Sequence, residues 1–529
     1  MQDSWQEIQA LYQHGEMERA KKASLAWVIR HPQDVTALHF LGMLYAEQED
    51  LTYAEEYLAQ AYNLNVEDAT VALHYANILK AQKKYSQAMQ VLFALHDVHP
   101  KFAAIYNNLG TLYFAEEKWQ DAITAFQTAL QLQADFIDAY YNLLLTFNKL
   151  NRKMEAKQVL DTLLALTPEH VGGLFQLGCF YMQENNYLAA IEPLAKIAER
   201  FPNHFETQTN LATCLFKLGR LKEAKKTYLN ALALKKDDVQ IYFNLAVIES
   251  QFGNLFAAEN YYLKALTINP DNFSIQYNLG VLLMKLQKSS DALQHFYQAL
   301  KVEPDNVVVQ HLINVIMQNK KITSAPLEYI RSLFDSYAYH YDAHMLNDLH
   351  YQLPELMFAA IQQFSQVAYQ QWRILDLGCG TGLCGESFKY SSNYLVGVDI
   401  AQQMLDVAQQ KNIYDELILS DIFAYLKNQL NHWNLILAGD VLGYVGDLNE
   451  FFPLVKQALT SSGYFIFSTE IEEQANYRMT SSGRFAYQRD YLEQLMKKNH
   501  FTLVSYQQIT LRTQQEQPVF AYLYVLKKD

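Results

Sequence analysis

Three glycines at alternate positions follow an apolar run that contains a single acid, Asp376. They are Gly378, Gly380 and Gly382, in the stretch WRILDLGCGTG of residues 372–382. The pattern predicts a buried parallel strand, a turn with almost no side chains, and then a helix. Glycines let a ligand approach the backbone closely, and a helix N-terminus offers free N–H groups. The turn therefore predicts a site for an adenosine cofactor, either a dinucleotide or S-adenosylmethionine.

Further acids stand where the next apolar runs end. Asp399 follows NYLVGV, Asp421 follows ELILS, and Asp440 follows NLILAG. A lone aspartate after a strand is usually a helix cap, but acids at the ends of four successive strands indicate a ligand site. Asp399 stands about twenty residues past the glycines, where a carboxylate can accept hydrogen bonds from both ribose hydroxyls. Ile400 and Met404 offer apolar surface beside it.

The elements that position these acids alternate between β-type and helix-type runs. We expect strands at residues 372–377, 393–398, 416–420, 434–438, 463–468, 501–506 and 519–526. Amphipathic stretches separate the first five runs, which predicts a doubly wound parallel sheet with its ligand at the carboxyl ends of the strands. Only the turn-rich RTQQEQP separates the last two runs, so they are predicted to form an antiparallel hairpin.

The position of the glycines distinguishes the two cofactors. A GxGxxG string exists as Gly380, Gly382 and Gly385, but the glycine directly after the strand is Gly378, and counting from it places Leu383 at the third position. With the terminal hairpin, this arrangement resembles the class I S-adenosylmethionine-dependent methyltransferases over residues 326–529. The nicotinamide dinucleotide remains the alternative.

The resemblance implies a seven-stranded Rossmann-like domain that binds S-adenosylmethionine. It implies that Asp421 and Ile422 contact the adenine, and that Asp440 faces the cleft where the methionine portion and the methyl acceptor meet. Residues 373–529 would form the catalytic core, and residues 323–372 a helical linker and cap.

The cap contains the phrase FDSYAYHYD, which resembles the N-terminal cap of small-molecule and carrier-type methyltransferases. By that resemblance Tyr337 and Tyr341 close over the cofactor. Tyr444 and His340 are candidate catalytic groups for the acceptor, although the sequence does not choose between them. Residues 482–484 (SGR) are candidates for an acceptor-binding loop, and the alternative is an ordinary turn before a helix. The acids at 470, 472 and 473 are expected to be solvated.

The first three hundred residues repeat with a period of 34. Alanine recurs in one phase at Ala20, Ala54, Ala88, Ala122, Ala156, Ala190, Ala224, Ala258 and Ala292. Twelve residues before each alanine stands a small residue, with Ile8 and Leu144 as exceptions. The stretch AIYNNLGTLYFAEEKWQDAITAFQTAL resembles the tetratricopeptide repeat family, which implies an all-α superhelix of nine repeats over residues 1–306. Residues 307–322 would form a capping helix.

An amide ladder follows the same period. Asparagine recurs at Asn108, Asn142, Asn210, Asn244 and Asn278, with Gln176 in the gap. Each amide offers a donor and an acceptor to a peptide backbone, and the spacing is similar to the asparagine ladder in the groove of O-GlcNAc transferase. The alternative is that these amides only bond neighbouring helices. We interpret the repeats as a groove for a protein or peptide.

Composition excludes several classes of function. The formal net charge is −14 over 529 residues, and neither half of the chain has a basic excess, so no bulk nucleic-acid partner is expected. Four dispersed cysteines predict neither a disulfide framework nor a metal site. The sequence lacks a signal-peptide core and an apolar run long enough to span a membrane, so we expect a cytoplasmic protein.

Three functions fit these patterns. The first is a methyltransferase that modifies a protein or peptide held by its own repeats. The second is a small-molecule methyltransferase whose repeats only mediate assembly, and the third is a non-catalytic repeat adaptor with a vestigial cofactor domain. Residues 481–496 and 509–528 resemble a bacterial group of tetratricopeptide-containing methyltransferases, which favours an enzyme.

Overall fold

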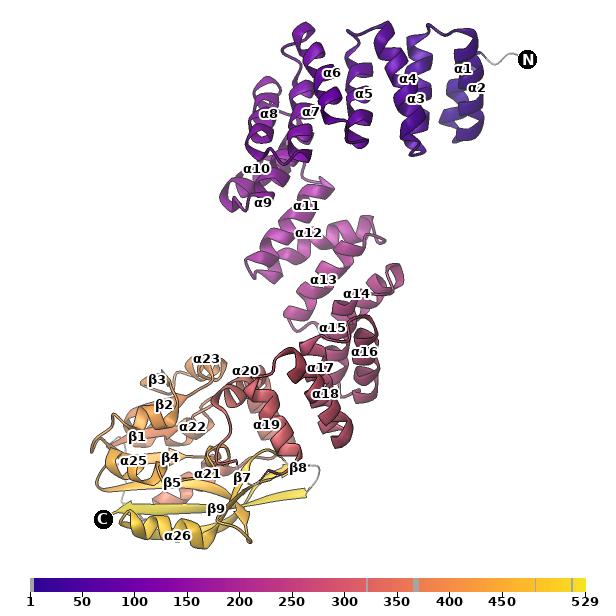
Figure 1. The fold of residues 1–529 in the computed structure, drawn as a ribbon. Coiled ribbons are helices and arrows are strands. Elements are labelled where there is room, and N and C mark those ends of the chain that lie inside the picture. The colour runs from indigo at the N-terminus through magenta and orange to yellow at the C-terminus, as the bar shows by residue number, and fades with distance from the viewer. Residues whose placement is uncertain (1–3, 320–321, 365–370, 481, 515–516) are drawn as a thin grey trace. The chain divides into compact units, whose positions relative to one another are not determined.

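The computed structural model describes residues 4–319, 322–364, 371–480, 482–514 and 517–529. The chain divides into two compact units, residues 1–237 and residues 238–529. The first unit is helical, and the second begins with helices and continues as an α/β domain (Figure 1). This confirms the predicted fold class. No helix among the described residues has both the length and the apolar character needed to cross a bilayer.

The described part of the first unit contains seven consecutive helix–turn–helix pairs. Their helices are α1 (Trp5–Gln13), α2 (Met17–Arg30), α3 (Val35–Glu47), α4 (Leu51–Leu64), α5 (Ala69–Ala81), α6 (Tyr85–Val98), α7 (Ala103–Ala115), α8 (Trp119–Leu132), α9 (Ile137–Lys149), α10 (Lys153–Leu166), α11 (Val171–Gln183), α12 (Tyr187–Arg200), α13 (Phe205–Lys217) and α14 (Leu221–Leu234). Neighbouring pairs share apolar clusters: the one around Leu92 of α6 includes Leu79 of α5, Leu109 of α7 and Ala125 of α8. Stacking therefore buries faces that one pair could not bury alone.

The second unit begins with two more pairs, formed by α15 (Val239–Gln251), α16 (Leu255–Ile268), α17 (Phe273–Lys285) and α18 (Ser289–Val302). Every pair in both units turns at a residue with a left-handed backbone, φ between +54° and +78°. These residues recur every 34 positions: Gly15, Glu49, Lys83, Glu117, Asn151, Asn185, Gly219, Gly253 and Gln287. The same helix-ending geometry is thus built mostly without glycine, although side chains disfavour it.

The small residue of each repeat makes room for a large one on the partner helix. A Cβ atom added at Gly110 would lie 2.5 Å from the ring of Phe126, which is fully buried. In the first repeat, Ile8 breaks the small-residue rule. Sixteen residues later, at the position equivalent to Phe126, this repeat has the small, buried Ser24. Large and small residues have changed places there, so the exception still obeys the packing constraint.

The rest of the second unit consists of helices followed by the α/β domain. The helices are α19 (Val307–Ile316), α20 (Leu327–Ala343), a π-helical turn η1 (His344–Asp348), α21 (Leu353–Gln362), α22 (Leu383–Phe388), α23 (Gln402–Gln410), α24 (Ile422–Leu426), α25 (Phe451–Ala458) and α26 (Arg489–Lys498), with short 3₁₀ turns η2 (Lys389–Ser391) and η3 (Leu442–Tyr444). The strands are β1 (Trp372–Leu377), β2 (Ser392–Asp399), β3 (Glu416–Leu419), β4 (Trp433–Ala438), β5 (Leu459–Glu472), β6 (Tyr477–Met479), β7 (Phe485–Gln488), β8 (Phe501–Gln514) and β9 (Gln517–Lys528).

The strands form one sheet in which β3, β2, β1, β4 and β5 run parallel in that order. On the far side of β5, β9 pairs antiparallel and carries β8, which is the predicted terminal hairpin. The seven predicted strands are present, but the described sheet has nine strands. The count of seven was wrong because β6 and β7, only three and four residues long, are too short to show a period.

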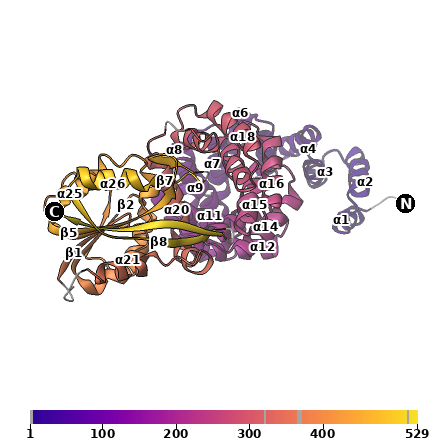
Figure 2. The same ribbon diagram turned by 90° about the horizontal axis from the view of Figure 1, so that it is seen from below.

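Helices cover both faces of the sheet (Figure 2). On one face, Met357 of α21 and Phe388 of α22 pack against Ile374, Leu395 and Leu437. On the other, α25 and α26 cover alternate residues of the same strands. Because both faces are buried, the strands read as continuous apolar runs, and the carboxyl ends of β1 to β4 remain open for a ligand.

Helix α19, which follows the last repeat, packs on the α/β domain. Val315 of α19 is 3% exposed and belongs to the same apolar cluster as Leu377 and Phe485, and Met284 of α17 contacts this cluster. A Cβ added at Gly483 would lie 3.4 Å from the Val315 side chain. The last helices of the repeat region therefore share a core with the α/β domain, in keeping with their place in one compact unit.

We predict that Gly110→Ala lowers the free energy of unfolding of the repeats by about 1–3 kcal/mol, because the added methyl overpacks the buried Phe126 ring. The double variant Gly110→Ala/Phe126→Leu recreates the Ala76 and Leu92 combination of the third repeat, so it should regain part of the loss. Urea denaturation of the three proteins measures both effects. Equal stability of the single variant and the wild type would contradict the steric argument.

Candidate functional site

The glycine turn joins β1 to α22 in a conformation that requires its glycines. φ is +65° at Gly378, +55° at Gly380 and +93° at Gly382. The N–H groups of Gly378 and Cys379 donate to the carbonyl of Val398 at 2.8 and 3.1 Å, which closes the turn against β2. A Cβ at Gly378 would lie 2.4 Å from Val441, whereas one at Gly380 would meet nothing within 4 Å. Gly378 thus permits close packing, and Gly380 leaves open space.

A cavity of about 530 Å³ lies at the carboxyl ends of the parallel strands. Its lining includes ten residues predicted for the site: Tyr341, Gly378, Gly380, Asp399, Ile400, Met404, Asp421, Ile422, Asp440 and Tyr444. Four other predicted residues are absent from the lining: Tyr337, His340, Asp376 and Gly382. The volume is in the range of small-molecule and cofactor pockets.

Two of the strand-end acids bond the backbone as well as line the cavity. Asp399 is 8% exposed and accepts hydrogen bonds from the N–H groups of Gly380 and Ala401, both at 2.9 Å. Burial raises the pKa of Asp399, and these backbone donors offset only part of that rise. Asp421 caps α24 by accepting from the N–H of Ala424 at 3.0 Å. Asp421 therefore caps a helix and also lines the cavity, so the cap does not rule out contact with a ligand.

Comparison with protein families agrees with this geometry. A methyltransferase domain model matches residues 370–519. Tetratricopeptide repeat models match residues 110–151, 137–170, 181–248, 239–272 and 274–306. The chain joins tetratricopeptide repeats to a methyltransferase domain.

The curated relatives match parts of the chain only. A ubiquinone biosynthesis O-methyltransferase of Bartonella quintana is 31% identical over 108 residues, which are 20% of this chain and 44% of the relative. The protein O-mannosyl-transferase Tmtc3 of Drosophila melanogaster is 32% identical over 146 residues, 27% of this chain and 14% of the relative. A bovine 18S rRNA (guanine-N(7))-methyltransferase is 43% identical over 49 residues, 9% and 17% of the two chains. The matched stretches thus span less than half of each relative.

Among solved structures, the crystal structure of the APC/C hetero-tetramer Cut9–Hcn1 is similar at 16% identity and a TM-score of 0.36, covering 57% of this chain and 59% of that chain.

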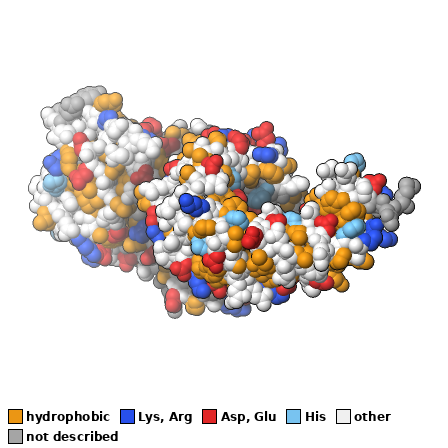
Figure 3. All heavy atoms as spheres, turned by 90° about the horizontal axis from the view of Figure 1, so that it is seen from above, with side chains coloured by type: hydrophobic (Ala, Val, Ile, Leu, Met, Phe, Trp, Pro, Cys, Tyr) orange, Lys and Arg blue, Asp and Glu red, His pale blue; other side chains and the backbone are white. Residues whose placement is uncertain are grey.

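On the face drawn in Figure 3, acidic and basic side chains are interspersed over the surface.

Asp376, near the end of β1 in the methyltransferase domain, is absent from the cavity lining. It is 1% exposed and accepts a 2.7 Å hydrogen bond from the Tyr414 hydroxyl. Burial raises the pKa of Asp376 to about 7, although the bond from Tyr414 lowers it. Added Cβ atoms at Gly382 and Gly385 would approach the Tyr414 ring within 3.0 and 2.5 Å. This pair therefore supports the turn.

Helix α20, in the region predicted as a cap, packs against the methyltransferase domain beside the cavity. Its Asp342 accepts a hydrogen bond from Thr381 of the glycine turn and forms an ion pair with Lys411 at 2.7 Å. Asp335 accepts from the N–H of Gln403 in α23 at 2.9 Å. These bonds hold α20 over the cavity, which Phe334, Tyr341 and Ile330 line.

The aromatic residues of the cap divide between the cavity and its surroundings. The Phe334 ring packs edge-on against Tyr444 at a centroid distance of 5.4 Å. Burial holds the pKa of Tyr341 well above its ordinary value, so its hydroxyl stays protonated. Tyr337 bonds His344 through its hydroxyl and lies outside the lining, and His340 is exposed on α20. Of the two candidate catalytic groups, only Tyr444 therefore reaches the cavity.

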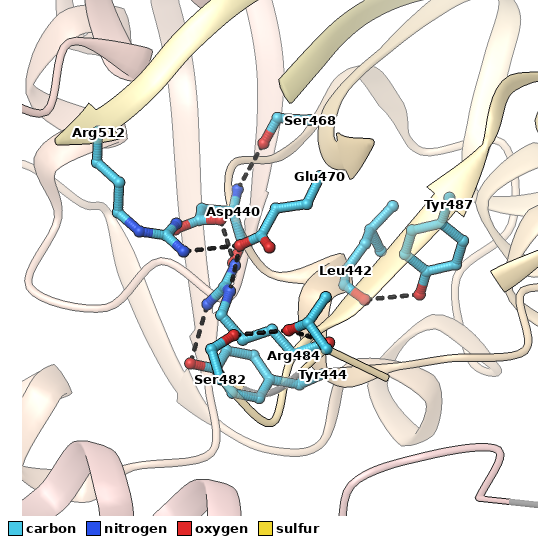
Figure 4. Close-up of polar contacts among 10 residues, drawn as sticks. Asp440, Leu442, Tyr444, Ser468, Glu470, Ser482, Arg484, Tyr487 and Arg512 are labelled. Atoms are coloured by element: carbon cyan, nitrogen blue, oxygen red, sulfur yellow. Dashed lines mark hydrogen bonds and ion pairs between the residues drawn. The ribbon is translucent and has the colours of Figure 1, made fainter. Parts of the chain in front are cut away.

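A largely buried network of two arginines and two acids includes Asp440, which lines the cavity; Figure 4 shows its contacts. Arg484 and Arg512 both form ion pairs with Asp440 and with Glu470. All four side chains are 9–12% exposed. Burial raises the pKa of Glu470, but the two guanidinium groups lower it by more, so this carboxylate stays charged.

Glu470, Glu472 and Glu473 follow the predicted fifth strand, and the prediction that they are solvated was wrong for two of the three. Glu470 lies in this network, and Glu472 is 5% exposed and pairs with Arg478 at 2.7 Å. Both belong to β5, which continues beyond the predicted strand, and β7 and β6 shield this extension. Arg512 was missed entirely, because a single arginine in a strand carries no local signal of burial.

The connection from the repeats also lines the cavity. Residues 323–327, which lead from α19 into α20, contribute to the lining. The carbonyl of Thr323 accepts from the N–H of Asp447 at 3.0 Å, and the N–H of Ala325 donates to the carbonyl of Tyr444 at 3.2 Å. A Cβ at Gly446 would lie 2.1 Å from the Thr323 carbonyl oxygen. The connection is therefore one wall of the cavity.

The asparagine ladder is divided between the two units, with its first three members in residues 1–237 and its last two in residues 238–529. Asn142 donates to Asn107 at 3.0 Å, Asn278 donates to the carbonyl of Ser274 at 2.8 Å, and Asn244 accepts from Gln240 at 3.1 Å. Asn210 bonds Cys179, and the Asn108 side chain is partly exposed. The ladder amides thus already use some of their donor and acceptor groups within the repeats. Each amide can form more than one hydrogen bond, so a peptide backbone can still bond the remaining groups.

We predict that Asp376→Asn stabilises the methyltransferase domain increasingly as the pH rises from 5 to 7. The folded pKa of about 7 exceeds the ordinary 3.8, so the folded state keeps a proton that the unfolded chain releases in this window. Stability therefore falls by roughly 1.4 kcal/mol per pH unit in the wild type, and the amide removes this slope. Urea denaturation at several pH values measures the difference. A pH-independent difference would show that Asp376 is ionised in the folded state.

Proposed function

We propose that residues 326–529 bind S-adenosylmethionine in the cavity and transfer its methyl group. The observation that carries this proposal is the convergence of the glycine turn with acids from three strand ends, Asp399, Asp421 and Asp440, on one cavity. Each of these residues had been singled out from the sequence for a part of this cofactor. The match of a methyltransferase domain model to residues 370–519 supports the same activity.

The residues present fit this cofactor. Gly380 borders open space where any side chain would stand, which suits a ligand lying on the backbone. Asp399 has two carboxylate oxygens that can each accept a further bond from ribose hydroxyls. Ile400, Met404 and Ile422 would contact the adenosine, and Asp440 would face the methionine portion.

The cofactor supplies a methyl group on a sulfonium whose departure leaves a neutral thioether. The protein then has to align the acceptor with the methyl group and exclude water, so positioning provides most of the acceleration. Phe334 and Tyr341 on α20 would exclude water from above. We propose that Tyr444 contacts the acceptor, because of the two candidate catalytic groups it alone lines the cavity.

We infer that the acceptor is a protein or peptide that the repeats recognise. This finer proposal rests on the connection from α19 to α20, which lines the cavity and continues directly from the repeat region. Holding a target on the repeats raises its effective concentration at the cavity. The competing function is a small-molecule methyltransferase, which the closure of α20 over the cavity favours.

We predict that the full-length chain binds S-adenosylmethionine and that Gly380→Arg abolishes binding, because the arginine side chain would occupy the ligand's space. Isothermal titration calorimetry measures both. Gly219→Arg is the matched control, since Gly219 also has positive φ and an added Cβ there meets nothing within 4 Å. It should bind as the wild type does. Retained binding by Gly380→Arg would mean that the cofactor lies elsewhere.

We predict that purified full-length chain transfers labelled methyl groups to protein bands of a lysate. Changing the five ladder asparagines to Ala should reduce the label at least severalfold while cofactor affinity stays unchanged. A chain with Asn203→Ala and Asn269→Ala, two exposed asparagines outside the ladder, is the control. If the ladder variant labels proteins as strongly as the wild type does, the ladder asparagines do not recognise the acceptor. Label found only in small metabolites would select the competing function.

A further inference from the structure

We infer that Arg484 is a positioning residue that holds Asp440 and Tyr444 in place at the methionine end of the cavity. This inference rests on the proposed function, because it assigns that end to the amino-acid portion of S-adenosylmethionine. Arg484 comes from the turn before β7, in residues 482–484, which the sequence indicated as a candidate acceptor loop; these residues are absent from the cavity lining.

Arg484 contacts three residues from two other segments of the chain with one guanidinium group. Nε donates to Glu470 Oε1 at 2.8 Å, and Nη1 donates to the Tyr444 hydroxyl at 2.9 Å. Nη2 donates to the Asp440 carbonyl at 3.2 Å and pairs with its carboxylate. The guanidinium also lies 4.8 Å from the centroid of the Tyr444 ring. Figure 4 shows these contacts. Two of the partners, Asp440 and Tyr444, line the cavity.

The surrounding backbone is shaped to let Arg484 reach these partners. Its carbonyl accepts from the N–H and the hydroxyl of Thr480 at 2.7 and 3.0 Å, which closes the turn that contains Gly483 at φ +78°. A Cβ added at Gly443 would lie 2.7 Å from Arg484 Nη2. Gly443 thus leaves the space through which the guanidinium passes to Asp440.

Asp440 needs such support because its backbone is left-handed, with φ +58°. A residue with a side chain keeps this conformation only where its surroundings impose it. Its N–H donates to Ser468 Oγ at 3.0 Å, and Arg512 Nη1 donates to its carboxylate at 3.3 Å. Its neighbour Val441 packs against Gly378, so Asp440 lies beside the glycine turn.

The geometry requires the forked side chain of arginine. A guanidinium presents several fixed donors in one plane, whereas a lysine ammonium is a single point charge on a flexible stem. Lysine at this position could neutralise one acid, but it could not bridge Glu470, Tyr444 and Asp440 together. Replacement by lysine therefore separates the geometric role from the charge.

The test compares the binding of two nucleosides to the full-length chain by calorimetry. S-adenosylhomocysteine has the amino-acid portion of the cofactor, and 5′-methylthioadenosine lacks it. Arg484→Gln should weaken the binding of S-adenosylhomocysteine roughly tenfold, which is the effect of losing a charge-assisted contact. The affinity for methylthioadenosine should stay within about twofold of the wild-type value. Arg484→Lys should fail to restore the loss.

Gly443→Ala displaces the guanidinium but keeps its charge, so it should show the same selective loss of affinity for S-adenosylhomocysteine. It is the alternative test if Arg484→Gln does not fold. The matched control is Arg478→Gln, which removes an arginine from neighbouring β6 that pairs with Glu472 outside the cavity lining. It should bind both nucleosides as the wild type does.

Selective loss in Arg484→Gln or Gly443→Ala without rescue by lysine supports the inference. Unchanged affinities, an equal loss of both nucleosides, or full rescue by Arg484→Lys would overturn it. If the wild-type chain binds neither nucleoside, the proposed function itself fails and this inference falls with it.

Discussion

The turn after β1 is the constraint on which the rest of the site depends. The N–H groups of Gly378 and Cys379 donate to the same carbonyl of β2, so the turn after β1 is held directly against that neighbouring strand. Val441, from the segment after β4, fills the space that a side chain at Gly378 would take. The ends of β1, β2 and β4 are thereby drawn together. Asp399 and Asp440 both reach one cavity because the glycine turn that lies between them in space has almost no side chains.

The buried acids around this turn have different tasks because their partners differ. Asp376 faces Tyr414 and has a pKa of about 7, so it supports the turn while partly protonated near neutral pH. Asp399 receives backbone donors at the edge of the cavity. Glu470 stays ionised because two guanidinium groups compensate for its burial. Similar depth thus gives different protonation according to which donors surround each carboxylate.

The repeat region and the methyltransferase domain are joined by packing as well as by sequence. Val315 of α19 lies in the core of the α/β domain, and the segment after α19 lines the cavity. The compact unit therefore begins at residue 238, within the repeats.

The sequence by itself determined the repeat pairs, the parallel strands and the glycine turn, because each is a local or periodic pattern. It also indicated Asp399, Asp421 and Asp440 as neighbours, since the carboxyl ends of parallel strands meet at one edge. Only the tertiary structure decided that Asp376 bonds Tyr414 outside the cavity lining and that Glu470 is largely buried. It also showed that Arg484 and Arg512 converge on Asp440, from 44 and 72 residues away. Contacts over such separations depend on how strands are ordered and covered, and no local pattern of residue types records that order.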